Sequence, residues 1–248
     1  MTARALEVIG ERWSLLIVRD LLLGPRRFTD LQRSLAGITA TRLTGRLRWL
    51  EEAGVVEREP AESGREVWYR LTDAGLALGP TIDALTLWGI EHARRPPAED
   101  EPVPSESAMI GTKVWLSRFG VAPRDGLTWV WRFPDEDRFT LRAADGTWLL
   151  TRGGHERAVV TVDATRRAWA AFLTSPRETR RLPNEEIRLE GSKAEIRSFA
   201  RAFAAQPVVW ASHVMRSASF GERAGTTRSR LAITWSKEWT SSLCSSTR

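Results

Sequence analysis

Two helical patterns joined by a short turn occupy residues 28–50, which read FTDLQRSLAGITATRLTGRLRWL. The first part predicts a short helix, and residues 36–38 predict a tight turn. Thr39 can cap a second helix, because its hydroxyl can accept an otherwise unpaired backbone N–H. Within that helix, positions i, i+4 and i+7 form an apolar stripe that we expect to be buried. The three residues of the stripe are Leu43, Leu47 and Leu50.

The flanking segments extend this pattern. Upstream, apolar residues between Ala5 and Leu21 recur at helical spacing until Gly24-Pro25. Downstream, residues 55–59 and 65–71 are β-prone runs around a Gly/Ser turn and predict a hairpin. Residues 73–92 are helical again, with Pro80 placed to kink the helix. Helices, a short helix, a three-residue turn, a helix and a hairpin are the order of a winged helix-turn-helix.

Four segments carry a family resemblance: 5–24 (ALEVIGERWSLLIVRDLLLG), 27–35 (RFTDLQRSL), 46–56 (RLRWLEEAGVV) and 69–75 (YRLTDAG). Together they closely resemble the HxlR-type bacterial transcriptional regulators over about residues 3–92. The resemblance implies a homodimer with outer helices at its interface and one recognition helix for each half-site of double-stranded DNA.

Residues 39–53 are the predicted recognition helix. Its N-terminal end should face base edges, since such helices present that end to the major groove. The residues expected there are Thr39, Ala40, Thr41 and Arg42. The residues expected near phosphates are Arg46 and Arg48 on the same helix and Arg27 before the first motif helix. The family resemblance implies a position for Arg65 in the hairpin near the minor groove or the flanking phosphates. The simpler alternative is a solvated polar helix face.

The charge distribution limits the electrostatic argument. Residues 1–95 contain 14 basic and 13 acidic side chains, whereas residues 207–248 contain six and two. DNA binding must therefore rest on the local placement of arginines, because the overall net charge of +6 comes mostly from the tail. Cys244 is the one cysteine. The thiol switch found in some HxlR-type proteins is therefore excluded for the winged helix, because such switches need a reactive thiolate.

Other function classes find little support in the 248 residues. We expect no transmembrane helix and no membrane partner, because no run of about 18 apolar residues exists. The N-terminus lacks the features of a secretory signal, so we expect a cytoplasmic protein. No hydrolase, P-loop or dinucleotide motif appears, and the three histidines lie far apart. We expect neither an enzyme nor a metal or other cofactor.

A proline-rich and acidic stretch separates two regions of different periodicity. We predict an α+β chain with a winged helix-turn-helix at 1–95, a linker at 96–107, a second domain at 108–206, and a basic, poorly ordered Ser/Thr-rich tail at 207–248. In the second domain, alternating strands follow a helix near Met109–Phe119 and precede helices near 164–174 and 192–205. Four or five meandering strands with flanking helices make an α+β domain.

Three stretches of this second domain resemble the sterol-carrier-protein-like domain: DRFTLRAADG (137–146), VVTVDA (159–164) and EIRLEGS (186–192). The resemblance implies an apolar tunnel for a lipid-like ligand. The candidate lining residues are Trp129, Trp131, Phe139, Trp148, Trp169 and Phe172. Large aromatic side chains on the inward face of a sheet are, however, usually core.

Three hypotheses follow. The leading one is a sequence-specific, dimeric DNA-binding regulator whose second domain binds an apolar effector. The second is a regulator whose second domain is structural only. The third is a lipid-binding carrier with an incidental winged helix.

Overall fold

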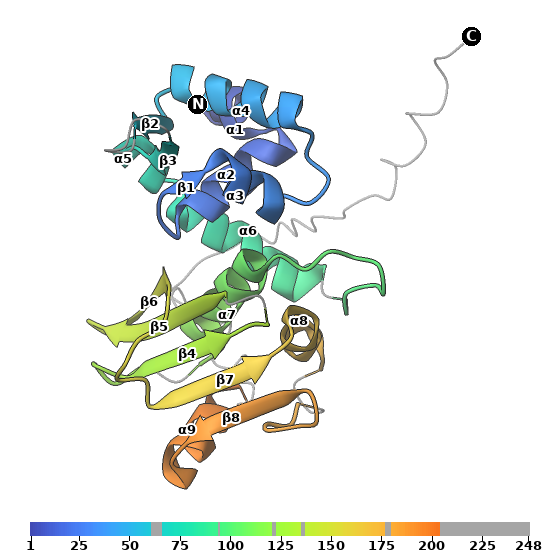
Figure 1. Cartoon of the computed structure of the whole chain (residues 1–248), viewed down its shortest axis with the longest axis vertical. Helices are drawn as coiled ribbons and strands as arrows, with labels where there is room; N and C mark the ends of the chain where they lie inside the picture. The colour runs from blue at the N-terminus through green and yellow to red at the C-terminus, as the bar shows by residue number, and fades with distance from the viewer. Residues whose placement is uncertain (61–65, 94, 121–122, 135–136, 177–179, 204–248) are drawn as a thin grey trace, which may run out of the picture. The chain divides into compact units, whose positions relative to one another are not determined.

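The computed structural model describes residues 1–60, 66–93, 95–120, 123–134, 137–176 and 180–203 (Figure 1). The predicted basic tail at 207–248, with Cys244, lies outside the described residues, and so does Arg65. No helix in the described part of the chain is both long and apolar enough to cross a membrane.

The first region is a winged helix-turn-helix. In chain order its elements are α1 (Thr2–Ile9), α2 (Arg12–Leu21), β1 (Arg26–Arg27), α3 (Phe28–Ser34), α4 (Ala40–Glu52), β2 (Val56–Pro60), β3 (Val67–Leu71), α5 (Asp73–Leu76) and α6 (Gly79–His92). The strands form an antiparallel sheet in the order β1-β3-β2. The predicted helix, turn, helix and hairpin are confirmed, whereas the two-residue strand β1 was not predicted.

Two boundaries differ from the sequence expectation. The apolar stripe expected to run from Ala5 to Leu21 is broken, because the Glu11 carboxylate accepts a hydrogen bond from Trp13 N at 2.8 Å and starts α2. The expected kink at Pro80 is also wrong. Pro80 lies in the first turn of a separate helix, α6, where its missing N–H costs no hydrogen bond.

The second region is a five-stranded sheet with three helices. Its elements are α7 (Ser105–Phe119), β4 (Thr128–Arg132), β5 (Arg138–Ala144), β6 (Thr147–Arg152), β7 (Val160–Ala164), α8 (Arg166–Thr174), β8 (Ile187–Gly191) and α9 (Lys193–Phe203). The strand order is β6-β5-β4-β7-β8 (Figure 1). A tight turn at Asp145-Gly146, where both residues have positive φ, joins β5 to β6.

The expected meander is only partly correct. Strands β4, β5 and β6 do form one, but the chain then crosses the sheet and places β7 parallel to β4. Trp129 on β4 lies opposite Val160 on β7, and Trp131 lies opposite Val162. Alternation along a strand identifies its buried face but not its neighbour, so the sequence could not reveal this crossover.

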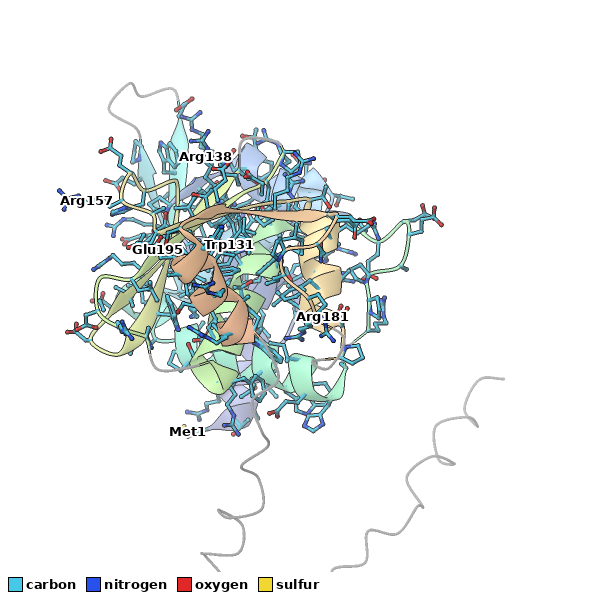
Figure 2. All side chains as sticks on the ribbon, turned by 90° about the horizontal axis from the view of Figure 1, so that it is seen from below. Met1, Trp131, Arg138, Arg157, Arg181 and Glu195 are labelled. Carbon is cyan, nitrogen blue, oxygen red and sulfur yellow. The ribbon has the colours of Figure 1, made fainter. Side chains whose placement is uncertain are left out.

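Aromatic side chains fill the space between the sheet and its helices. The centre of the Trp131 ring lies 5.4 Å from the ring centre of Trp169 on α8 and 5.8 Å from that of Phe199 on α9. Figure 2 shows Trp131 within the body of the molecule, whereas Arg157 projects from its edge. Trp131 and Phe199 are fully buried, so these rings are core.

Helix α7 belongs to two hydrophobic clusters. Met109 and Trp115 pack with the five-stranded sheet, whereas Ile110 and Val114 pack with the core of the winged helix. Residues 1–206 accordingly form one compact unit. A helix that is buried on most sides is expected to lack a strong apolar–polar contrast, and α7 is buried along most of its length.

A buried carboxylate joins α2 to α3. Asp20 is fully buried, and its side chain accepts hydrogen bonds from Ser34 Oγ at 2.5 Å and from Arg19 Nε at 2.8 Å. Burial raises the pKa of Asp20 above its ordinary value, although the Arg19 charge opposes this shift. The contact with Ser34 fixes the end of α3, immediately before the turn that leads to α4.

We expect Thr112→Val to destabilise the fold. Trp169 Nε1 donates a hydrogen bond to Thr112 Oγ1 at 2.7 Å inside the core. Valine has nearly the same shape but no acceptor, so the indole N–H would be left unpaired at a cost of about 1–3 kcal/mol. Urea denaturation measures this loss. Thr151→Val on the exposed side of β6 is the matched control and should change the unfolding free energy by less than about 0.5 kcal/mol. Equal effects would contradict the assignment.

Candidate nucleic-acid interface

Helix α4 is held so that one face is buried and the other faces solvent. Leu43, Leu47 and Leu50 are at most 2% exposed, as the sequence predicts. The Thr39 hydroxyl accepts a hydrogen bond from Arg42 N at 3.3 Å, which confirms the predicted cap. The cap satisfies a backbone donor that would otherwise lack a partner in the first turn.

The N-terminal end of α4 is open. All four residues expected near base edges are exposed: Thr39, Ala40, Thr41 and Arg42. The Arg42 side chain has neither an ion pair nor a hydrogen bond with any described residue. Its guanidinium is therefore available for an external partner, and the fork of donors matches guanine O6 and N7.

The other two α4 arginines have carboxylate partners. Arg46 Nε lies 3.5 Å from Glu11 Oε2, the same carboxylate that caps α2. Arg48 Nε lies 2.9 Å from Glu52 Oε1 one helical turn later. The Arg48 pair is largely exposed, and such pairs contribute at most about 1 kcal/mol, so a phosphate can replace the carboxylate.

Arg27 lies at the base of the wing. Its guanidinium pairs with Glu66 at 2.8 Å and lies 4.6 Å from the centre of the Trp68 ring. Its backbone N–H donates to Asp30 Oδ2 at 3.3 Å at the start of α3. Arg27 is thus half-exposed and already oriented. Arg65, the other predicted wing contact, lies outside the described residues.

The wing strands carry ion pairs that sequence reasoning missed. Arg70 on β3 pairs with Glu57 and Glu59 on β2, at 3.0 and 3.2 Å. Arg58 on the opposite side of β2 pairs with Glu51 of α4 at 3.1 Å. The i, i+2 spacing of Glu57 and Glu59 could have predicted this face, because residues two apart point to the same side of a strand.

Gly45 leaves a gap in the side chains on the exposed face of α4. A Cβ atom built there meets no atom within 4 Å. Glycine within a helix costs about 1 kcal/mol relative to alanine, so it is unfavourable for the free protein. The gap lies one turn after Thr41 and allows a DNA backbone to approach the helix closely.

The predicted ligand-lining aromatics pack against one another. The ring centres lie 4.7 Å apart for Trp129 and Trp148, 5.1 Å apart for Trp169 and Phe172, and 6.0 Å apart for Phe139 and Phe133. Phenylalanines of α9 fill further space between the rings. All six predicted residues are at most 6% exposed: Trp129, Trp131, Phe139, Trp148, Trp169 and Phe172. A ligand among them would have to displace packed rings.

Among the described residues, no group of three or more His, Cys, Asp or Glu side chains is placed to hold a metal ion. The five-stranded sheet offers no metal-binding cluster in that part of the chain.

Comparison with known proteins places the winged helix in a family. Residues 8–96 match the family described as HxlR-like helix-turn-helix. An uncharacterized HTH-type transcriptional regulator of Mycobacterium tuberculosis is 49% identical over 94 residues, which are 38% of this chain and 59% of that protein. The uncharacterized HTH-type transcriptional regulator YvaP of Bacillus subtilis is 36% identical over 89 residues, 36% of this chain and 82% of its own length.

Among solved structures, the redox regulator HypR in its reduced form is 32% identical to this chain. The superposition covers 37% of this chain and 92% of HypR, with a TM-score of 0.36. The chain spans less than two thirds of the length of the mycobacterial relatives that it matches. The family match ends at residue 96, so the resemblance of residues 108–206 to sterol carrier proteins stays a prediction.

Proposed function

The chain belongs to the HxlR-like helix-turn-helix family, and we propose that it is a transcriptional regulator that binds specific double-stranded DNA as a homodimer. The observation that carries this proposal is the exposed N-terminal end of α4, where the Arg42 guanidinium has no partner among the described residues. Relatives in this family are named HTH-type transcriptional regulators, which supports the same function.

The first turn of α4 carries the residues proposed to contact base edges. The Arg42 guanidinium can donate two hydrogen bonds to one guanine, and the Thr41 methyl can pack against a thymine methyl. Thr39 and Ala40 lie beside them at the helix start. The Thr39 hydroxyl accepts the Arg42 N–H, so its role is to hold Arg42 in position as well as to face the DNA.

The residues proposed to contact phosphates are arginines, and three of them already pair with carboxylates. Arg27 forms a half-exposed ion pair and Arg48 a largely exposed one, which a phosphate can replace at little cost. Arg46 is tied to Glu11, so its role includes fixing α4 against α2. Arg65 remains a proposed contact near the minor groove. Because contacts by Arg27, Arg46 and Arg48 each replace an existing ion pair, we expect moderate nonspecific affinity.

The proposed dimer rests on apolar side chains of the outer helices. Leu6 on α1 is 57% exposed, and Leu85 and Trp88 on α6 are 50% and 60% exposed. Large apolar side chains on two helices of one small domain are typical of a contact surface. The second copy of this chain is the proposed partner, as the family resemblance implies.

Control by an apolar effector in the aromatic core is the less supported part of the sequence hypothesis, because the six aromatic side chains are packed. The alternative of a structural second domain fits this packing better. The lipid-carrier alternative would need the same core to open.

We expect Arg42→Ala to weaken specific DNA binding about tenfold or more, because a bidentate arginine–guanine contact is worth about 1–3 kcal/mol. Fluorescence anisotropy with the DNA upstream of the protein's own gene measures the Kd, with scrambled duplex as competitor at low and physiological salt. Arg138→Ala, on the exposed surface of β5, removes the same charge elsewhere and should leave the Kd unchanged. Equal losses for both variants would indicate only phosphate attraction and would count against sequence-specific recognition.

Gly45→Ala should have opposite effects on stability and on DNA binding. Alanine meets open space in the free protein and should stabilise α4 by up to about 1 kcal/mol. The added methyl group would obstruct the approach of DNA and raise the Kd. Thermal unfolding and anisotropy, performed on the same sample, measure the two effects. Unchanged DNA affinity in the stabilised variant would place the DNA away from Gly45.

Trp88→Glu should convert the homodimer to a monomer and weaken DNA binding, because a carboxylate would be buried in the apolar interface. Sedimentation velocity measures the mass. Leu76→Glu on α5 makes the same kind of change at a side chain that is 52% exposed, and it should leave the dimer intact. A wild-type protein that sediments as a monomer, or dimers in both variants, would refute this interface.

A further inference from the structure

A charged pocket lies where the helix-turn-helix meets the second region. Its volume is about 550 Å³. The end of α3 and the following turn form one wall, and the residues before and at the start of α7 form another. The charged side chains that line the pocket are Arg26, Arg33, Arg152, Arg166, Asp30, Glu106 and Asp137.

Three of these arginines share two carboxylates. The buried Glu106 carboxylate accepts hydrogen bonds from Arg26 and from Arg152 through the same oxygen. Asp137 pairs with Arg152 at 2.8 Å and with Arg166 at 3.3 Å. The fourth arginine, Arg33, is mostly exposed and lies 3.6 Å from Asp30. The lining therefore holds four guanidinium groups and three carboxylates.

Arginines outnumber carboxylates among the residues that line the pocket. Burial acts to raise the pKa of Asp137, but the hydrogen bond from Ser105 and the charges of Arg152 and Arg166 outweigh it and lower that pKa. Asp137 is thus ionised at neutral pH. The Arg33 side chain is the most exposed of the four arginines, at 80%, so its guanidinium is open to an external anion.

The remaining wall is apolar. It consists of Ala36 from the turn and Pro102, Val103 and Pro104 from the segment before α7. A ligand that fits both parts carries an anionic group for the arginines and a short apolar body for the prolines. Carboxylate and phosphate groups share this chemistry.

We propose that this pocket binds a small amphiphilic organic anion and that its occupancy controls DNA binding. Ser34 and Ala36 line the pocket and lie just before Thr39, which caps α4. A ligand held between this turn and Arg152 and Arg166 on β6 and α8 can therefore bias the position of α4. The effect on DNA rests on the proposed function above, whereas the binding of the anion does not.

Isothermal titration calorimetry of the full chain tests the binding step. The probes are hexanoate, hexyl phosphate and the neutral hexanamide. We expect saturable binding of at least one anion and none of hexanamide. Arg166→Gln and, separately, Arg33→Gln should weaken binding about tenfold or more, because each variant removes a guanidinium that can donate a charge-assisted hydrogen bond to the anion. Arg188→Gln, on the exposed part of β8, is the matched control and should have no effect.

The two anions separate the two chemistries, because tighter hexanoate identifies a carboxylate ligand and tighter hexyl phosphate identifies a phosphate ligand. Equal binding of hexanamide, no binding of either anion, or unchanged affinity in both pocket variants would overturn the proposal and leave the cluster as a structural ion-pair network.

The effect on DNA binding is tested by repeating the anisotropy assay in the presence of the anion that binds. A shift in the DNA Kd supports control, and an unchanged Kd in a protein that binds both ligands overturns it. A protein that binds the anion but no DNA would instead fail the proposed function.

Discussion

The burial of α7 on both of its sides is the constraint on which the rest of the structure depends. Met109 and Trp115 complete the core of the five-stranded sheet, while Ile110 and Val114 complete that of the winged helix. Neither core is closed without this helix, so the two regions are not independent in the way that a proline-rich linker suggests. The first turn of α7 also supplies Glu106, whose carboxylate binds Arg26 of the wing sheet and Arg152 of β6.

Shared side chains also position α4, whose exposed side is the proposed DNA-binding surface. Glu11 caps α2 and holds Arg46 of α4, while Asp20 joins α2 to the end of α3. These contacts fix the angle at which α4 leaves the turn. The result is a rigid helix whose leucines are buried and whose first turn is exposed. Preorganisation of this kind matters because a bidentate base contact tolerates little error in position.

Much of the winged helix could be predicted from the sequence, because its signals are local. The cap at Thr39, the leucine stripe and the turn at residues 36–38 each depend on residues within one or two turns of chain. The sequence could not predict the parallel pairing of β4 with β7, since alternation does not encode a partner. It also could not predict every arginine pair. The i, i+4 spacing of Arg48 and Glu52 could have predicted that pair, but Arg46 pairs with Glu11, which lies 35 residues earlier in the chain.

The contrast between the aromatic core and the charged pocket decides where a ligand could act on DNA binding. A ligand changes an equilibrium only through a difference in its affinity for the two states. The aromatic rings come from the sheet and its helices, so a ligand among them makes no contact with the turn before α4. The charged pocket takes its walls from α3, the turn before α4, α7, β6 and α8. A displacement of the turn by even a fraction of a hydrogen-bond length alters that pocket, because guanidinium–anion contacts depend steeply on distance and direction. A ligand in the charged pocket therefore acts on the turn before α4 by direct contact, whereas a ligand in the aromatic core could reach it only through α7.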